Sequence, residues 1–175
     1  MHPALAPLAR RYFNGDPHPG NILLLDNNKL GLIDYGQVKA LSKENRIKLA
    51  KMIVALTDND KEEAIRLIRS VGYKTKHEND ELCYLYTVLV LDADNKKLTR
   101  GMHIQTFMES MEKEDPIVAL PREFVMVSRV SLMLRGLGHA LKQPRSIAKA
   151  WRPLAERVLR EEGEEKYIDR RREHN

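Results

Sequence analysis

The chain has 175 residues, a single cysteine, few aromatic residues and no long uninterrupted apolar run. One cysteine excludes an internal disulfide framework, and Cys83 stands among apolar residues, which favours a buried role over a metal or nucleophile role. The longest apolar run, 82–91, falls short of the roughly 18 residues that a membrane-spanning helix needs. Aromatic residues make up 6% of the chain and do not alternate with arginine, so no nucleic-acid partner is expected.

The composition is that of one soluble globular domain with a hydrophobic core, since 42% of the residues are hydrophobic and 31% are charged. The net charge of +5 is concentrated in residues 121–175, which carry 13 basic and 8 acidic side chains. This basic C-terminal third suits a lipid or membrane surface or an acidic partner. A solvated helical face with a charged tail is the interpretation that the pattern favours.

The residues with the clearest chemistry lie near the start of the chain. The segment 14–21 reads Asn-Gly-Asp-Pro-His-Pro-Gly-Asn, and two apolar runs follow it, separated by a turn at 26–28. This pattern predicts a strand, a tight turn and a second strand. The open end of such a hairpin brings Asp16, Asn21 and Asp34 close together, and their oxygen atoms are ligands suited to Mg²⁺ carrying phosphate.

The spacing of these residues is also informative. An Asp, an Asn five residues later and an Asp-aromatic-Gly thirteen residues after that Asn follow the order of the protein-kinase catalytic and metal-binding loops. Asp16-Pro17-His18-Pro19-Gly20-Asn21, followed by Leu32-Ile33-Asp34-Tyr35-Gly36-Gln37, resembles the UbiB (aarF-domain, ABC1-type) family of atypical protein-kinase-like proteins. The two motifs cover only a small part of the chain and are specific as a pair rather than singly.

The resemblance implies a role for each motif residue. Asp16 would be catalytic and would orient or deprotonate the attacking hydroxyl or water. Asn21 and Asp34 would hold the Mg²⁺ that bridges the phosphates of ATP, and His18 and Gly36 are further cofactor-binding candidates. For His18, which stands between two prolines, a structural role in a rigid loop is favoured.

The chain also departs from the kinase pattern. Asn14-Gly15-Asp16 replaces the kinase His-Arg-Asp triplet, so the Arg that pairs with a phosphorylated activation loop is missing. The Lys-x-Gly-Gln motif and the Ala-rich phosphate loop of the family have no counterpart here. We therefore expect the C-terminal lobe of a larger protein, or a truncated product, which would need a missing N-terminal lobe in cis. Gln37 matches the family pattern, but its function is not assigned.

The implied function is Mg-ATP-dependent phosphotransfer or ATP hydrolysis in the complete protein. By resemblance it is linked to ubiquinone, prenylquinone or lipid metabolism, and to mitochondria or plastids if the source is eukaryotic. Whether this chain is itself an active enzyme stays open. The alternative is a non-catalytic helical interaction module that retains kinase-like motifs. Titration with Mg²⁺-ATP separates the two, because metal-dependent nucleotide binding is expected of the kinase-like domain and not of the module.

The predicted fold is mainly α with a small β-hairpin, a protein-kinase-like C-terminal lobe in which a helical bundle follows a catalytic hairpin. Residues 1–162 form this lobe, with the loops at 14–37 and the helical part at 42–162, and residues 163–175 form a charged, disordered tail. The residues just before the loop are expected to end a helix. Helices are predicted at 4–13, 42–56, 60–71, 82–91, 104–114 and 121–141, and from 146 onward with a break or kink at Pro153.

Three details of the helical part remain to be tested. The run 82–91 is rich in β-branched and aromatic residues, so a strand is the alternative, but its helical neighbours favour a helix. Arg129 and Arg135 lie on a largely apolar helix and should pair with carboxylate or carbonyl groups rather than with substrate. Trp151 suits either a membrane anchor or the core, and the core is favoured.

Overall fold

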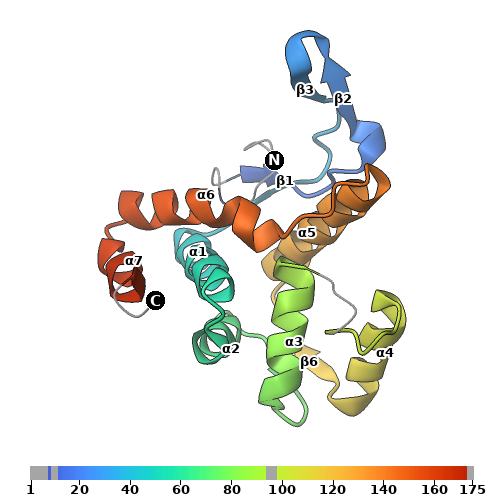
Figure 1. Cartoon of the computed structure of the whole chain (residues 1–175). Helices are drawn as coiled ribbons and strands as arrows, with labels where there is room; N and C mark the ends of the chain where they lie inside the picture. The colour runs from blue at the N-terminus through green and yellow to red at the C-terminus, as the bar shows by residue number, and fades with distance from the viewer. Residues whose placement is uncertain (1–7, 9–11, 94–97, 173–175) are drawn as a thin grey trace.

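The structure is a computed structural model that describes residues 8, 12–93 and 98–172. It is mainly helical, with small two-stranded antiparallel sheets, as Figure 1 shows. The helices are α1 Lys43–Thr57, α2 Lys61–Ser70, α3 Asp80–Leu91, α4 Ile104–Glu114, α5 Arg122–Ala140, α6 Ile147–Glu161 and α7 Glu165–Arg172. The strands are β1 Tyr12–Asn14, β2 Ile22–Leu25, β3 Lys29–Leu32, β4 Val38–Ala40, β5 Lys74–Thr75 and β6 Ile117–Ala119, and short 3-10 turns lie at η2 Pro19–Asn21 and η3 Asp26–Asn28.

The predicted hairpin is confirmed. Strands β2 and β3 pair in antiparallel register, with Ile22 opposite Leu32 and Leu25 opposite Lys29. The turn between them ends at Asn28, whose φ of 57° lies in the left-handed region that Asn tolerates better than most residues. The hairpin projects away from the helices in Figure 1. Its open end therefore faces the helical body, and its closed end points into solvent.

A second pair of strands, β1 and β4, holds the base of the hairpin and was not predicted. Tyr12 lies opposite Ala40 and Asn14 lies opposite Val38. The expectation of a helix over 4–13 is wrong for residues 12 and 13, because they pair with the chain that follows Gly36; residues 4–7 and 9–11 lie outside the described part. This pairing sets the chain that enters the first loop beside the chain that leaves the second.

The predicted helix starts are confirmed by their capping bonds. The Ser42 hydroxyl accepts from the amide of Asn45 at 3.1 Å, and the Asp60 carboxylate accepts from the amide of Glu63 at 2.9 Å. The Ser146 hydroxyl caps α6 in the same way. The run 82–91 lies in α3, so the helix prevails over the strand alternative. Its burial between other helices outweighs the strand propensity of single residues.

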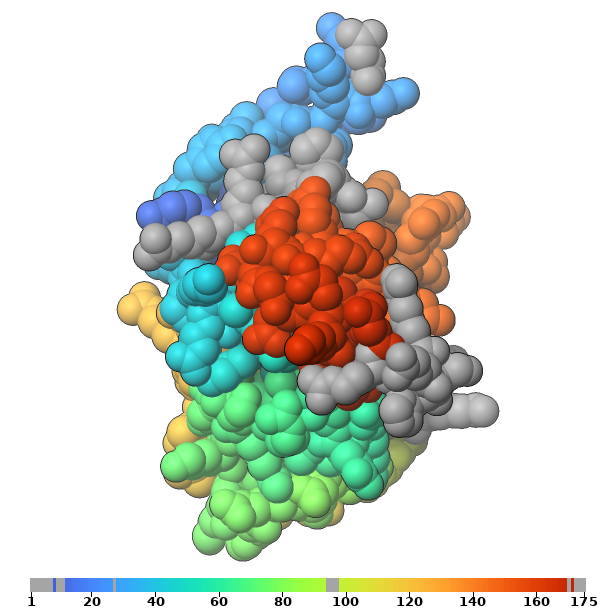
Figure 2. All heavy atoms as spheres, turned by 90° about the vertical axis from the view of Figure 1, so that its left-hand side faces the viewer, coloured from blue at the N-terminus to red at the C-terminus, as the bar shows by residue number. Residues whose placement is uncertain are grey.

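The core lies where α1 packs against α6 and α2, and where α3 packs against α2 and α5. Figure 2 shows α6 and α7 as an orange-to-red surface beside α1, with the blue hairpin region extending beyond the helices. Trp151 is fully buried in this core, as predicted. Cys83 is buried too, and burial raises the pKa of its thiol to about 11, so it stays protonated at neutral pH. No helix among the described residues is both long and apolar enough to cross a membrane.

The expectation of a disordered tail over 163–175 is wrong for residues 165–172, which form α7. Ile168 is buried, the Tyr167 hydroxyl lies 3.1 Å from a carboxylate oxygen of Glu63, and Arg171 pairs with Asp60 at 2.7 Å. Helix α7 is therefore held against α2 by one buried apolar side chain and by polar contacts with Glu63 and Asp60. Residues 173–175 lie outside the described part.

The helix α6 continues through Pro153, so the predicted break does not occur there. A proline inside a helix removes one backbone hydrogen bond. The packing of α6 along α1 holds the helix together despite that loss, because Trp151 and Ala155 on either side of the proline are fully buried.

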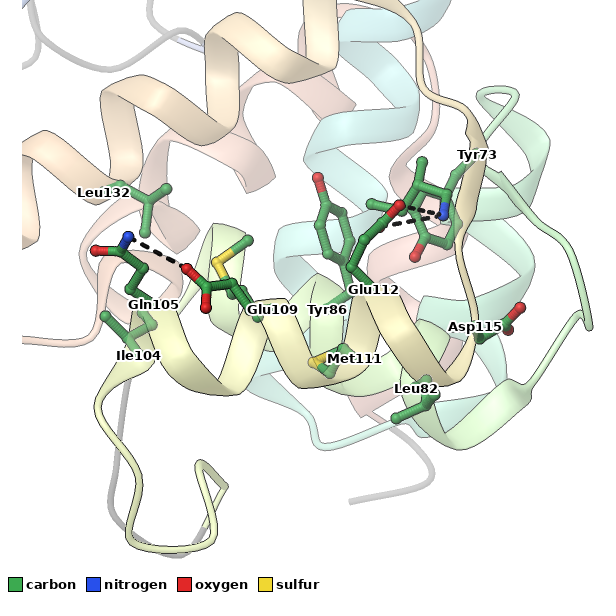
Figure 3. Close-up of a pocket in the computed structure, with 12 residues that line it drawn as sticks. Tyr73, Leu82, Tyr86, Ile104, Gln105, Glu109, Met111, Glu112, Asp115 and Leu132 are labelled. Atoms are coloured by element: carbon green, nitrogen blue, oxygen red, sulfur yellow. Dashed lines mark hydrogen bonds between the residues drawn. The ribbon is translucent and has the colours of Figure 1, made fainter.

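Two apolar residues of the segment 121–141, which was predicted to be helical, are exposed. Val125 of α5 is 44% exposed, and Leu141, the residue that follows α5, is 65% exposed. Leu132 is half-buried and lines a cavity of about 420 Å³ between α3, α4, α5 and β6, where Figure 3 shows it across from Tyr86 and Met111. Helix α4 therefore covers this side of the core without filling it.

Candidate functional site

The first loop is folded by bonds within its own sequence. The His18 imidazole accepts at Nδ1 from the amide of Gly20 at 3.1 Å, which caps the short 3-10 turn that ends at Asn21. His18 is exposed and performs the structural role that its neighbouring prolines indicate. Its assignment as a cofactor-binding residue stays a prediction.

Asn14 joins the two loops. Its side-chain amide donates to the carbonyl of Asp34 at 2.7 Å, and its side-chain oxygen accepts from the amide of Asp16 at 2.8 Å. Asn14 is 6% exposed, so these bonds are shielded from water. The amide of Gly15 adds a bond of 2.8 Å to the carbonyl of Gln37. The sequence interpretation named Asn14 as part of the triplet that replaces the kinase His-Arg-Asp, but it assigned no role to this residue.

The carboxylate of Asp16 is held on both oxygens. Gln37 donates to Oδ2 at 3.3 Å, and Arg129 of α5 places Nη2 at 3.2 Å from Oδ1. Arg129 also donates through Nη1 to the side-chain oxygen of Gln37 at 3.1 Å, which closes a triangle of three side chains. The predicted carboxylate partner of Arg129 is thus the candidate catalytic residue itself. Arg135 finds its predicted partner in the carbonyl of Leu89.

Asn21 and Asp34 lie at the same end of the hairpin. The Asn21 amide group donates to the carbonyl of Asp16 at 3.4 Å, and its backbone carbonyl accepts from the amide of Ile33 at 3.2 Å. Asp34 is exposed, and its Oδ1 accepts from the amide of Gly36 at 2.7 Å. A Cβ at Gly36 would lie 3.1 Å from that oxygen, so glycine suits this tight turn. The hairpin thus brings the three predicted residues to one end.

The oxygens of this end are chemically suited to magnesium. The described residues contain no group of three or more His, Cys, Asp or Glu side chains arranged for a metal ion. Mg²⁺ does not need such a cage, because it keeps several waters and binds through one or two carboxylates and the phosphates of its substrate. The side-chain oxygens of Asn21 and Asp34 fit that demand, and Asp34 is open to solvent.

The paired loops and the hairpin between them carry the residues whose spacing resembles that of the kinase loops, and the comparisons with known proteins are consistent with this resemblance. Residues 6–68 match the model of the ABC1 atypical kinase-like domain. This part of the chain, which contains both loops, is similar to that family.

Three curated relatives show the extent of the likeness. An uncharacterised protein from the hydrogenase 1 5′ region of Clostridium pasteurianum is 28% identical over 72% of this chain and 24% of its own length. Protein ACTIVITY OF BC1 COMPLEX KINASE 1, chloroplastic, of Arabidopsis thaliana is 33% identical over 37% of this chain and 9% of its own. An uncharacterised Synechocystis protein is 41% identical over 35% of this chain and 16% of its own. The chain therefore spans a quarter or less of these relatives. No solved structure matches it significantly.

Proposed function

We propose that this chain supplies the catalytic and metal-binding half of a Mg²⁺-dependent ATP site. In this proposal it is the C-terminal lobe of an atypical kinase or ATPase. The observation that supports it most is Asn14, whose two hydrogen bonds tie the backbone of Asp16 to that of Asp34. These bonds fix the two acidic residues relative to each other, which a shared nucleotide site requires.

Each residue has a chemical task in this proposal. Asn21 and Asp34 would hold Mg²⁺, which when bound neutralises the phosphate oxygens of the nucleotide. Asp16 accepts the proton of the attacking hydroxyl or water, or orients that group. Gly36 lets the chain turn close to Asp34, and His18 fixes the path of the first loop. These contributions are mainly positioning and charge, which is what phosphoryl transfer needs from a protein.

The two acidic residues should be separable by experiment. In the complete protein, Asp34→Asn should abolish metal-dependent nucleotide binding, whereas Asp16→Asn should spare binding and reduce turnover. The chain alone should bind Mg²⁺-ATP weakly and hydrolyse it hardly at all, because the adenine pocket and the phosphate-gripping Lys come from the other lobe. Thermal shift and phosphate release, with and without Mg²⁺, measure both effects.

The matched control is Asp26→Asn, which removes a carboxylate at the closed end of the same hairpin. It should change neither binding nor turnover. Metal-independent thermal shifts, or equal shifts for wild type and Asp34→Asn, would contradict the proposal and favour the non-catalytic interaction module. Vigorous hydrolysis by the short chain, lost in Asp34→Asn, would show that the other lobe contributes less than proposed.

The biological setting is proposed from the resemblance alone. A link to quinone or lipid metabolism and a mitochondrial or plastid location follow from the family. Contact of the basic C-terminal third with lipid receives little support, because its charges are partly neutralised within the fold. Arg152 pairs with Asp58 and Glu156, and Arg160 also pairs with Glu156.

A further inference from the structure

The two acidic residues of the site have different electrostatic surroundings. Asp16 faces the guanidinium group of Arg129 on one oxygen and the Gln37 amide on the other. Its Oδ1 is shielded from water and lies beside Arg129 without an aligned hydrogen bond, so it keeps the capacity to accept one. Asp34 is exposed and makes no ion pair within the described part of the chain. One carboxylate is therefore paired with a cationic side chain, and the other is open to solvent.

The place of Arg129 follows from the close contact between the first loop and α5. A Cβ at Gly15 would lie 2.7 Å from Cε of Met126 and 2.8 Å from the carbonyl oxygen of Gln37, so no larger residue fits without displacing the chain. The loop consequently has no room for a positive side chain at position 15. Arg129 follows Met126 by three residues, about one turn of α5, so the two residues lie on the same face of the helix. The positive charge beside Asp16 therefore comes from Arg129 of α5 and not from the loop.

We propose that Arg129 and Gln37 are positioning residues that assign different tasks to the two carboxylates. They keep Asp16 out of the coordination shell of the cation, so that it serves the attacking hydroxyl, and they leave Asp34 to the cation. This inference rests on the proposed function and deepens it. The physical reason is competition, because a guanidinium group and a divalent cation bind the same carboxylate oxygens. The Arg129 side chain is 43% exposed, so the ion pair contributes little to stability and should be detected in binding.

The test is the affinity of the chain for Mn²⁺, titrated as a magnesium substitute and followed by the loss of the free-ion EPR signal. Arg129→Gln frees Asp16 to join the cation, so its affinity should rise about fivefold. Arg129→Lys retains the charge and should stay near wild type. Arg122→Gln removes the same charge from an exposed site at the start of the same helix and should also stay near wild type.

A second substitution identifies the carboxylate responsible. Asp16→Asn alone should leave the Mn²⁺ affinity nearly unchanged, because Asp16 is not a ligand in the wild type. In the Arg129→Gln background the same change should remove the whole gain. A purely structural role for Arg129 predicts the opposite sign, since a loosened loop would bind the cation more weakly. The NMR signal of the Gln37 side-chain amide should shift in Arg129→Gln and not in Arg122→Gln, which reports directly on the opened triangle.

The outcomes separate this inference from the proposed function. Wild-type binding that depends on Asp34, without an Asp16-dependent gain in Arg129→Gln, would overturn the role of Arg129 and keep the metal site. Binding by Arg129→Gln alone, through Asp16, would support the role of Arg129 and overturn the assignment of Asp34. Absence of Mn²⁺ binding in every variant would overturn both.

Discussion

The helical body and the hairpin region differ in how their side chains are used. Most apolar residues of α1, α3 and α6 are buried, whereas Leu24 of the hairpin is 73% exposed and Ile33, which follows β3, is 59% exposed. Ile22, Leu30 and Leu32 of the hairpin are only partly buried against the helical core, and polar bonds such as those of Asn14 hold the base of the hairpin. Folding stability should therefore come from the helices, and chemistry from the polar base of the hairpin.

The largest effect that this comparison predicts is in the centre of the helical body. Leu89 of α3 is fully buried, so Leu89→Ala should lower the free energy of unfolding by about 2–5 kcal/mol. Leu132 lines the cavity and already lacks neighbours on one side, so Leu132→Ala should cost less, about 1–2 kcal/mol. Urea denaturation of both variants measures the difference. Equal losses would show that the cavity is closed in solution.

Asp115 is a buried polar residue on which several backbone groups depend. It accepts from the Thr75 hydroxyl at 2.7 Å and from the amides of His77 and Asn79 at 2.6 and 2.9 Å. Burial raises the pKa of this carboxyl, but these bonds outweigh it and hold the pKa below its usual value. Asp115→Ala should cost about 1–3 kcal/mol, because the three donors lose their acceptor.

The lowered pKa also predicts a pH dependence. The carboxylate of Asp115 contributes stability above the unfolded pKa of about 3.8, and this contribution is lost as the pH falls through the lower folded value. The midpoint of urea denaturation should therefore fall more steeply below about pH 4 in the wild type than in Asp115→Ala. Parallel curves for the two proteins would contradict the assignment.

The helix caps should have a smaller effect. The Ser42 hydroxyl satisfies the amide of Asn45 at the start of α1. Ser42→Ala should lower the free energy of unfolding by about 1 kcal/mol. Ser42→Asp should keep most of the stabilisation by the cap, because a carboxylate can also accept from the amide of Asn45. Denaturation of the two variants measures the cap, and an equal loss in both would indicate that the hydroxyl has another partner.

The smallest effect is expected at the tip of the hairpin. Leu24→Ser should change the free energy of unfolding by less than about 0.5 kcal/mol, because Leu24 is largely exposed. A loss as large as that of Leu89→Ala would show that the hairpin belongs to the core and would remove the distinction between the two regions.

Much of this arrangement could be predicted from the sequence, where the signal is local. The helix starts at Ser42, Asp60 and Ser146 could be predicted, because a capping bond joins residues only three positions apart and so leaves a local pattern in the sequence. The hairpin could be predicted because two apolar runs flank a short turn. The likeness to the ABC1 family could be inferred from Asp16, Asn21 and Asp34, because their spacing along the chain is itself the motif.

What could not be predicted depends on contacts between distant residues. The hydrogen bond that Arg129 donates to Gln37 joins residues 92 positions apart, and neither residue stands in a sequence pattern that predicts the other. Strand β1 forms only by pairing with β4, and α7 is held by contacts such as the ion pair between Arg171 and Asp60, the residue that caps α2. Local pattern carries no information on such pairs, so the triangle around Asp16 became visible only in the structure.

The central claim is that a cation binds at the open end of the hairpin, and paramagnetic NMR tests it most directly. Substoichiometric Mn²⁺ added to the ¹⁵N-labelled chain should broaden the backbone amide signals of the non-proline residues in 16–21 and of residues 33–36. It should leave those of α2 and α4 sharp, and the broadening should disappear in Asp34→Asn and persist in Asp26→Asn. Broadening centred elsewhere, or unchanged by Asp34→Asn, would contradict the account.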